Sequence, residues 1–260
     1  MIAFPGKTAP LAGPVTLKIV TYNIQDILIV GHDRAKRMRA LGKTLSELDP
    51  DIVGFQEAFV TRDRNILIDS LAQSRLKFHK YFPSRAVGSG LLISSAYPIQ
   101  ETSFHCYAAS NPWYKIWEGD WWAGKGAALT RIELPDGKGY IHIFNTHAQA
   151  GYKNPAYDKI RFRQMNELAD FMNSSRIEAI PAFLVGDLNC GEKSEEYKLV
   201  AGEANLIRLL TIPSYIDHIF AIENPRYSFE VSSSVAIAKR DGLRLSDHNG
   251  YMLTVYIIPR

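Results

Sequence analysis

The sequence contains little cysteine and no long apolar run. Cys106 and Cys190 are the only cysteines among 260 residues, so no disulfide framework can hold the fold, and we expect both thiols to be reduced. No stretch approaches the roughly 18 consecutive apolar residues that cross a bilayer, and residues 1–20 lack a basic segment followed by an apolar one. The sequence therefore predicts no membrane span and no signal peptide, which leaves the cytoplasm, or export without a recognisable signal, as its compartment.

A strong charge excess and low-complexity segments are also missing. The net charge is +3 and the pI is about 8.7, a mild basic excess that allows a phosphate-bearing partner but is weaker than in most dedicated DNA-binding domains. With 46% hydrophobic and 22% charged residues, the chain can bury a large core. We predict a single domain over residues 1–260, with residues 1–15, which hold three prolines and two glycines, as a loose lead-in.

Apolar periodicity predicts an α/β chain. Residues 35–48 carry Met38, Leu41 and Leu45 at spacings of three and four, which is typical of an amphipathic helix, and Arg37 is predicted on its charged face. Apolar and β-branched runs bounded by glycine, proline or aspartate predict strands. Further helices are predicted at residues 65–72 and 160–172, and strands at residues 17–22, 52–55, 91–95, 127–134, 140–144, 182–185 and 251–258.

Polar side chains end or interrupt several of these strands. The apolar run at residues 182–185 stops at Gly186 and then presents Asp187 and Asn189, which share a face if the chain stays extended. Each such residue alone is commonplace in a turn, but α/β proteins place their chemistry at strand ends, so together they predict one site. The set consists of Asn23, Glu57, His147, Asp187, Asn189, Asp217, Asp247 and His248.

These residue types suit a hard cation and a general base. Mg²⁺ prefers oxygen ligands and usually takes one or two carboxylates, so Glu57 is the first candidate ligand, with Mn²⁺ as an alternative ion. Zinc is not expected, because cysteine plays no part and no two histidines have ligand spacing. Asp217 near His248 would fix the imidazole tautomer and make His248 a general base for water. Further candidate metal ligands are Asn23, Asp187, Asn189 and Asp247.

The ordered motifs resemble those of the endonuclease/exonuclease/phosphatase superfamily. The resemblance spans nearly the whole chain and implies a four-layer fold, in which two mainly antiparallel β-sheets pack face to face between helices. It also implies Mg²⁺-dependent hydrolysis of phosphoesters. The motifs are Thr21-Tyr22-Asn23-Ile24, Gln56-Glu57, Asn145-Thr146-His147, Gly186-Asp187-Leu188-Asn189, Ile216-Asp217-His218-Ile219-Phe220 and Ser246-Asp247-His248.

Three further stretches are similar to the neutral sphingomyelinases, a phospholipase C-type branch of that superfamily. The third of them, residues 119–126, resembles a loop in which an Asp and a Lys act together near the active site. This resemblance gives Asp120 and Lys125 those roles. Without the family, Lys125 could equally neutralise a phosphate or be a solvated surface lysine. The chain departs from the branch after His147, where Gln149 and Gly151 replace a second histidine and an acid. The stretches are residues 32–38, residues 88–91 with 97–101, and residues 119–126.

All four tryptophans lie within ten residues of one another. Tryptophan favours membrane interfaces, and its ring attracts quaternary ammonium groups such as choline, so we predict contact with substrate or membrane. Packing beneath a long loop and stacking on nucleobases are alternatives. Nucleic acid is the less expected partner, because Lys115 and Lys125 are the only cations between Tyr107 and Leu129. The cluster consists of Trp113, Trp117, Trp121 and Trp122.

Motifs and resemblance together predict a Mg²⁺-dependent phosphodiesterase that hydrolyses sphingomyelin or a related choline phospholipid to phosphocholine and a lipid alcohol (ceramide). In this assignment His147 and Asn189 stabilise charge on phosphorus, and Asp187 positions water or His248. A nuclease or phosphoinositide phosphatase of the same superfamily, and a catalytically silent lipid-binding module, are the alternatives. Membrane contact is expected to be peripheral, because the chain ends directly after a strand, where some relatives carry a span. Neither the preferred head group nor the oligomeric state is predicted.

Overall fold

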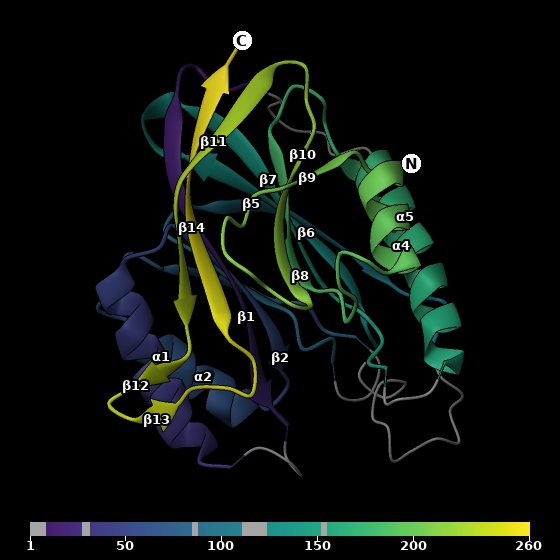
Figure 1. Ribbon diagram of the computed structural model, residues 1–260. Coiled ribbons are helices and arrows are strands. Elements are labelled where there is room, and N and C mark those ends of the chain that lie inside the picture. Colours follow the sequence, from purple (N-terminus) through teal and green to yellow (C-terminus); the bar gives the residue numbers. More distant parts are fainter. Residues whose placement is uncertain (1–8, 28–31, 85–87, 111–123, 152–154) are drawn as a thin grey trace.

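Two six-stranded sheets lie face to face in the structure, a computed structural model that describes residues 9–27, 32–84, 88–110, 124–151 and 155–260 (Figure 1). In spatial order, the first sheet joins β11 (Tyr227–Ile237), β14 (Gly250–Pro259), β1 (Val15–Asp26), β2 (Ile52–Ala58), β4 (Leu92–Ser95) and β3 (Phe78–Tyr81). The second joins β5 (Ile99–Cys106), β6 (Gly126–Leu134), β7 (Gly139–His147), β8 (Ala182–Asp187), β10 (Asp217–Ile222) and β9 (Leu206–Arg208).

Helices cover the outer face of each sheet (Figure 1). Helices α1 (Arg34–Leu48) and α2 (Thr61–Ser70) pack on the first sheet, and α4 (Ala156–Ser175) and α5 (Glu195–Glu203) pack on the second. A small hairpin of β12 (Lys239–Arg240) and β13 (Leu243–Arg244) lies beside α1. The pairs β1–β2 and β7–β8 are parallel and the other neighbouring strands are antiparallel. The predicted four-layer α/β sandwich with mainly antiparallel sheets is confirmed.

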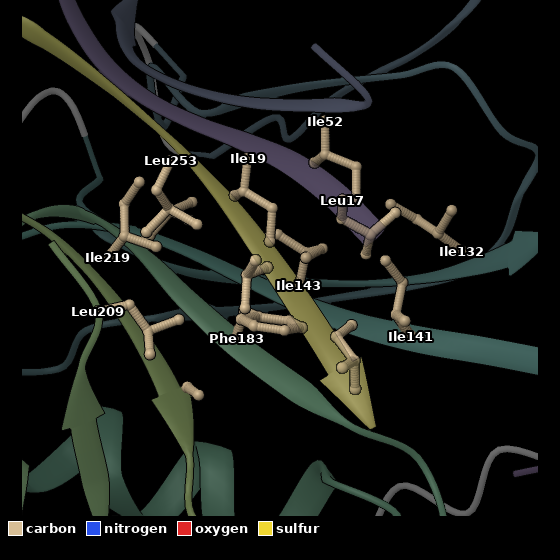
Figure 2. Packing of buried hydrophobic residues seen from close by; sticks show 14 of the residues in the cluster. Leu17, Ile19, Ile52, Ile132, Ile141, Ile143, Phe183, Leu209, Ile219 and Leu253 are labelled. Carbon is tan, nitrogen blue, oxygen red and sulfur yellow. The ribbon is translucent and has the colours of Figure 1, made fainter. Parts of the chain in front are cut away.

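The two-residue period of β1 separates two hydrophobic layers. Leu17 and Ile19 point toward the second sheet and belong to the same buried cluster as Phe183 of β8 (Figure 2). Val20 and Tyr22 point the other way, into the cluster beneath α1 and α2. Because successive side chains of a strand alternate between its faces, a strand buried on both sides is apolar throughout. Hydrophobic packing therefore holds β1 in place on both of its faces, up to the polar residues near its end.

The predicted helices and strands are confirmed, with ends that shift by several residues. Strand β1 runs on to Asp26, and α2 begins at Thr61 rather than at residue 65. The sequence analysis missed β5 and β11, which are edge strands with partly exposed faces, and the short helix α5. Half-exposed edge strands lack a clean apolar alternation, and α5 buries only Glu196 and Val200. Periodicity alone carries little signal for such elements.

The predicted charged face of α1 is wrong at one position. Arg37 is only 5% exposed, although we placed it with the solvated residues of the helix. It precedes Leu41 and Leu45 by four and eight residues and therefore lies on the same side of the helix as these core residues. A long side chain at the border of an apolar stripe can turn inward when polar partners are present, and the partners of Arg37 lie next to the candidate site.

A pair of buried amides connects the two sheets below that site. Gln56 of β2 donates from Nε2 to Oδ1 of Asn145 of β7 at 2.8 Å and to Thr21 Oγ1 at 3.2 Å. Asn145 in turn donates from Nδ2 to the Phe55 carbonyl oxygen at 3.0 Å. Gln56 and Asn145 are fully buried, where an unpaired amide would be costly, so these bonds favour one relative position of β2 and β7. That position places Glu57 opposite His147.

Candidate active site

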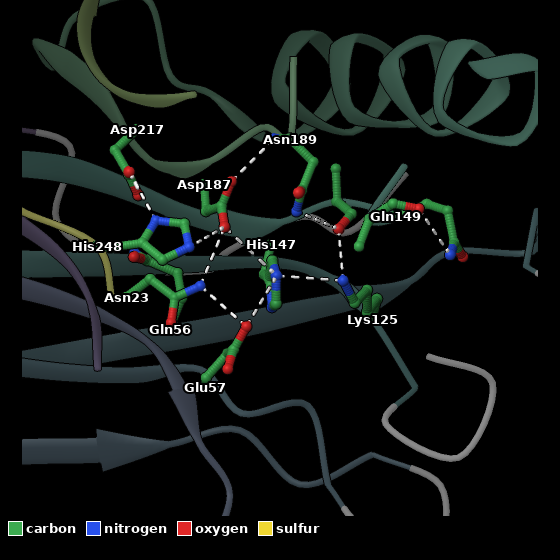
Figure 3. A network of polar contacts seen from close by, with 12 residues as sticks. Asn23, Gln56, Glu57, Lys125, His147, Gln149, Asp187, Asn189, Asp217 and His248 are labelled. Carbon is green, nitrogen blue, oxygen red and sulfur yellow. Dashed lines mark hydrogen bonds and ion pairs between the residues drawn. The ribbon is translucent and has the colours of Figure 1, made fainter. Parts of the chain in front are cut away.

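The candidate site lies at one end of both sheets, where strands from the whole length of the chain meet (Figure 3). Because β1 and β2 are parallel, Asn23 and Glu57 follow the same direction out of the first sheet. Parallel β7 and β8 place His147 directly opposite Asp187, and antiparallel β10 begins with Asp217, which is also opposite Asp187. His248 stands just before β14 begins. The structure thus brings together six of the predicted site residues from six strand ends.

Asn23 holds two carboxylates side by side. Its Nδ2 donates to Glu57 Oε1 and to Asp187 Oδ2, both at 3.0 Å. Burial raises the pKa of the Glu57 carboxyl to about 7, and burial with the nearby charge of Asp217 raises the pKa of Asp187. Glu57 also has a φ of 59°, a left-handed conformation that costs energy for a residue with a side chain. Asp187 is buried and Glu57 is partly buried, and this pair of acids, joined by one amide, forms an oxygen-rich cradle suited to a cation.

Asp187 reaches this position because Gly186 lets β8 approach β7 closely. Gly186 has a φ of 154°, and a Cβ atom built there would lie 2.3 Å from the Thr146 carbonyl oxygen. Any other residue at position 186 would push the two strands apart. The glycine before the acid is therefore a packing requirement of the site.

His248 is oriented by Asp217. Its Nδ1 lies 2.8 Å from Asp217 Oδ2, so the ring turns Nε2 inward, 3.8 Å from Asp187 Oδ2. Burial alone would lower the pKa of His248, but the hydrogen bond with Asp217 and the charge of Asp187 outweigh it and raise the pKa to about 9. An imidazole held by a carboxylate at Nδ1, with Nε2 facing a polar cluster, has the geometry of a general base.

Two groups of side chains in the site could be considered for a metal ion. Ligand atoms of Asp187, Asp217 and His248 lie within 4.8 Å of one another. However, the contact between Asp217 Oδ2 and His248 Nδ1 already occupies both atoms at hydrogen-bond distance. Glu57 and Asp187 offer carboxylate oxygens on either side of the Asn23 Nδ2, whereas Asn23 Oδ1 accepts from the Gln25 backbone N–H at 3.1 Å. Oxygen is the donor that Mg²⁺ prefers. The donor chemistry therefore fits a hard cation beside Glu57.

Lys125 is an internal cation of the site. Its side chain is 5% exposed, and Nζ lies 3.1 Å from His147 Nε2 and 2.6 Å from the Ala148 carbonyl oxygen. Burial and the charge of Lys125 hold the pKa of His147 well below its ordinary value, so the ring is neutral. His147 Nε2 is also 3.7 Å from Glu57 Oε1 and 3.6 Å from Asp187 Oδ2. The alternative of a solvated surface lysine at position 125 is wrong.

Asn189 and Asp247 lie differently from the expectation. Asn189 has a φ of 51°, so the chain does not stay extended after Asp187. Its backbone N–H instead donates to Asp187 Oδ1 at 2.8 Å, and its Nδ2 donates to the Ala148 carbonyl oxygen at 3.0 Å. Asp247 is exposed, and its oxygens accept from Gln25 Nε2 at 2.9 Å and from Ser246 Oγ at 3.2 Å. Asn189 thus fixes the Asp187 carboxylate, while Asp247 lies at the rim.

The sequence analysis missed three residues that support the site. Gln25 holds Asp247, Ser246 donates from Oγ to the Asn23 carbonyl oxygen at 2.7 Å, and Arg37 contacts the backbone on both sides. Gln25 follows Asn23 by two residues and Ser246 begins the last motif, so nearness to the motifs was a usable signal. For Arg37 the only signal was its four-residue spacing to the buried face of α1.

Cys190, which directly follows Asn189, is buried and 4% exposed. Burial raises the pKa of its thiol to about 12, so the reactive thiolate is scarce near neutral pH.

Gln149, at the point where the chain departs from the sphingomyelinase pattern, is buried, and its backbone N–H donates to Gln164 Oε1 of α4 at 2.7 Å. Asp120 and the four tryptophans Trp113, Trp117, Trp121 and Trp122 lie outside the described residues.

Two face-to-face sheets with a polar cluster at one shared end define a four-layer α/β sandwich protein. The model of the Endonuclease/Exonuclease/phosphatase family matches residues 20–248, and the chain belongs to this family. A crystal structure of a double mutant of beta toxin from Staphylococcus aureus with bound magnesium ions has the same fold, with a TM-score of 0.70 at 20% identity over 95% of this chain and 100% of that one.

Curated relatives are similar in sequence as well. Sphingomyelin phosphodiesterase 2 of Rattus norvegicus is 32% identical over 177 residues, which cover 68% of this chain and 42% of the relative. Inositol phosphosphingolipids phospholipase C of Schizosaccharomyces pombe is 29% identical over 206 residues, which cover 78% of this chain and 48% of the relative. The chain therefore spans less than half the length of these relatives. None of the helices within the described residues is both long and apolar enough to span a bilayer.

Proposed function

We propose that this chain is a Mg²⁺-dependent phosphodiesterase that hydrolyses sphingomyelin, or a related choline phospholipid, to phosphocholine and a lipid alcohol, which is ceramide when the substrate is sphingomyelin. One observation carries the proposal: an imidazole oriented by a carboxylate, His248 on Asp217 at 2.8 Å, faces the oxygen cradle of Glu57 and Asp187. A base for water thus lies next to a cation site, which is the arrangement that hydrolysis of a phosphodiester needs. Both curated relatives are named as phosphodiesterases or phospholipases that act on sphingolipids, which supports the choice of substrate class.

Glu57 and Asp187 would hold the metal, with Asn23, Asn189 and Asp247 as further candidates from the sequence. When bound, Mg²⁺ would polarise the phosphate oxygens and neutralise part of their charge; Mn²⁺ is the alternative ion. The raised pKa of Glu57, caused by burial, supports the fit, since a cation would relieve the cost of keeping this carboxylate charged. Asn23 keeps both acids in place through its two hydrogen bonds.

His248, in its neutral form, would remove a proton from water at Nε2 while Asp217 holds its Nδ1–H. A cation held by Glu57 and Asp187 would favour this neutral form, because it offsets the carboxylate charge that raises the pKa of His248 in the metal-free protein. Asp187 Oδ2, 3.8 Å from that Nε2, would position the water between the imidazole and the phosphorus atom. The water oxygen then forms a bond to phosphorus, the bond from phosphorus to the ceramide oxygen breaks, and the ceramide oxygen takes a proton from solvent. Contact with a lipid surface belongs to this proposal, because the substrate is a membrane lipid.

Lys125 would stabilise the negative charge that grows on the phosphate oxygens. We inferred this role for His147 and Asn189 from the sequence, but His147 Nε2 lies 3.1 Å from the Lys125 ammonium and the Asn189 amide donates to Ala148. With those contacts His147 Nε2 accepts a hydrogen bond rather than donates one, and the ammonium becomes the natural partner of the phosphate. Joint action with Asp120, which the resemblance implies, stays a prediction.

Replacing Lys125 by methionine should lower kcat by about 100-fold, because it removes a charged donor from a water-poor site. KM should change much less, since the ammonium acts mainly on charge that develops during the reaction. Steady-state kinetics of phosphocholine release measures both. Lys198→Met serves as the matched control, because Lys198 on α5 is 59% exposed and pairs with Glu195. A Lys125→Met enzyme within threefold of the parent would reduce this lysine to a packing role.

The proposed reaction is tested by phosphocholine release from sphingomyelin in mixed micelles, with Mg²⁺ and with EDTA. Inositol phosphoceramide, a phosphoinositide and supercoiled plasmid are offered to the same preparation. Phosphocholine release that needs Mg²⁺ supports the proposal. Cleavage of inositol phosphoceramide alone would mean that the enzyme prefers an inositol head group to choline. Plasmid nicking or phosphate release without phosphocholine would favour a nuclease or phosphatase, and binding of lipid vesicles without any turnover would favour a silent lipid-binding module.

A further inference from the structure

Arg37 makes four hydrogen bonds, all to backbone carbonyl oxygens around the candidate site. Nε donates to His32 at 2.9 Å, Nη1 donates to Ile24 at 3.0 Å and to Leu245 at 2.9 Å, and Nη2 donates to Gln25 at 2.8 Å. The guanidinium therefore uses four of its five N–H donors on the backbone. Its side chain bridges the end of β1 and a segment more than 200 residues later in the chain.

Those two segments carry both halves of the proposed machinery. Ile24 and Gln25 directly follow Asn23, which holds Glu57 and Asp187. Leu245 begins the turn that ends in His248, and Ser246 of that turn bonds to the Asn23 carbonyl oxygen. A shift of either segment would change the position of the His248 ring relative to the Glu57 and Asp187 carboxylates.

No other side chain could replace this guanidinium easily. Its planar fork reaches three carbonyl oxygens from β1 and the turn at once, whereas a lysine ammonium is a point charge at the end of a flexible stem. Burial lowers the pKa of Arg37, which shows that the buried charge has a cost, and the carbonyl dipoles offset it. Gln25, one of the acceptors, has a φ of 49°, a strained conformation that persists only when its surroundings hold it.

We propose that Arg37 is a positioning residue for catalysis, which keeps the His248 turn in register with the carboxylates at the end of β1 and β2. The proposal rests on the proposed function, because His248 must act as the base. It requires a metal-dependent cleavage of some phosphodiester, but not sphingomyelin as the substrate.

The test is the Arg37→Lys variant, alone and combined with His248→Ala. Kinetics use sphingomyelin micelles and, separately, the soluble diester bis(p-nitrophenyl) phosphate, each with Mg²⁺. We expect kcat to fall by about 10- to 100-fold, as for a misplacement of roughly 1 Å, while KM changes less than about threefold. In the His248→Ala background the same substitution should have almost no further effect, because its only route to catalysis is removed.

A second measurement, by NMR, does not depend on turnover. The proton in the hydrogen bond between His248 Nδ1 and Asp217 should give a low-field NMR resonance, which Arg37→Lys should shift or broaden. Arg131→Lys is the matched control, because Arg131 of β6 is also buried, 4% exposed, and pairs with Glu101 of the edge strand β5. This control should keep both the resonance and kcat.

Several results would overturn the proposal. One is an unchanged kcat and resonance in folded Arg37→Lys, and another is an equal loss of residual activity with and without His248. If the lysine variant does not fold, Arg37→Gln is measured in the same way, and failure of both to fold would make Arg37 a folding residue instead. Cleavage of the soluble diester without cleavage of sphingomyelin would reject the proposed substrate, yet Arg37→Lys could still be tested on the diester and by NMR.

Discussion

The His248→Ala variant should lose about 10³-fold in kcat with its fold intact, since a positioned general base contributes about 10²- to 10⁴-fold. His248 has one strong side-chain partner, Asp217, and its side chain is 18% exposed, so its removal leaves no large cavity in the core. Phosphocholine release measures the loss, and circular dichroism checks the fold. Near-normal activity in folded His248→Ala would show that another group activates the water.

The role of Asp217 can be separated from that of His248. Asp217→Asn keeps the shape of the side chain but can offer an N–H where His248 Nδ1–H needs an acceptor, so the imidazole would take the wrong tautomer. We expect a large loss in kcat, and the double variant should be no worse than His248→Ala alone. Losses that multiply in the double variant would mean that Asp217 acts independently of the imidazole.

The same pair predicts how stability depends on pH in metal-free protein. The pKa of His248 rises from 6.5 to about 9 on folding, despite burial, because Asp217 and Asp187 favour the charged ring. A raised histidine pKa stabilises the folded state fully below 6.5, and this contribution is lost as the pH rises through about 9. Urea titrations at these two pH values measure the unfolding free energy. It should fall less for His248→Ala than for the parent as the pH rises from the lower value to the higher.

The site residues could be found from the sequence because each stands near one end of an apolar run. Asp187 comes after a strand buried on both faces, and His147 and Glu57 end strands of the same kind. Such runs are readable, and parallel pairs within a sheet bring their ends together. The resemblance of the motif set then supplied the two-sheet sandwich, which periodicity alone does not predict, since it says nothing about which strands pair.

The role of Arg37 could not be found because its contacts join distant segments through the backbone. Arg37 bonds to carbonyl oxygens at positions 24, 25 and 245, and a carbonyl oxygen leaves no mark in the sequence. The conformation of Asn189, with a φ of 51°, depends on its bonds to Asp187 and Ala148, so assuming an extended chain there gave the wrong geometry. Local pattern identifies which groups are present, whereas tertiary contacts decide where they point.

Replacing Glu57 by glutamine should reduce activity and stabilise the metal-free protein, two effects of opposite sign from one change. Loss of a principal metal ligand should lower kcat/KM by about 10³-fold, or about 4 kcal/mol. Burial raises the pKa of Glu57 from 4.5 to about 7, so the folded state holds a proton more tightly than the unfolded state between these values. Stability therefore falls as the pH rises through that range, and an ionised Glu57 costs on the order of 1 kcal/mol or more above it.

Glutamine keeps an oxygen that can accept from Asn23 and removes the buried charge. At pH 8 without metal, Glu57→Gln should thus unfold at a higher temperature than the parent, while Mg²⁺ should stabilise the parent and leave the variant unchanged. Thermal unfolding with EDTA and with Mg²⁺ gives all four values, and Glu195→Gln, at a side chain that is 76% exposed, is the matched control. A Glu57→Gln protein that Mg²⁺ still stabilises as strongly as the parent would place the metal elsewhere, with the group of Asp187, Asp217 and His248 as the next candidate.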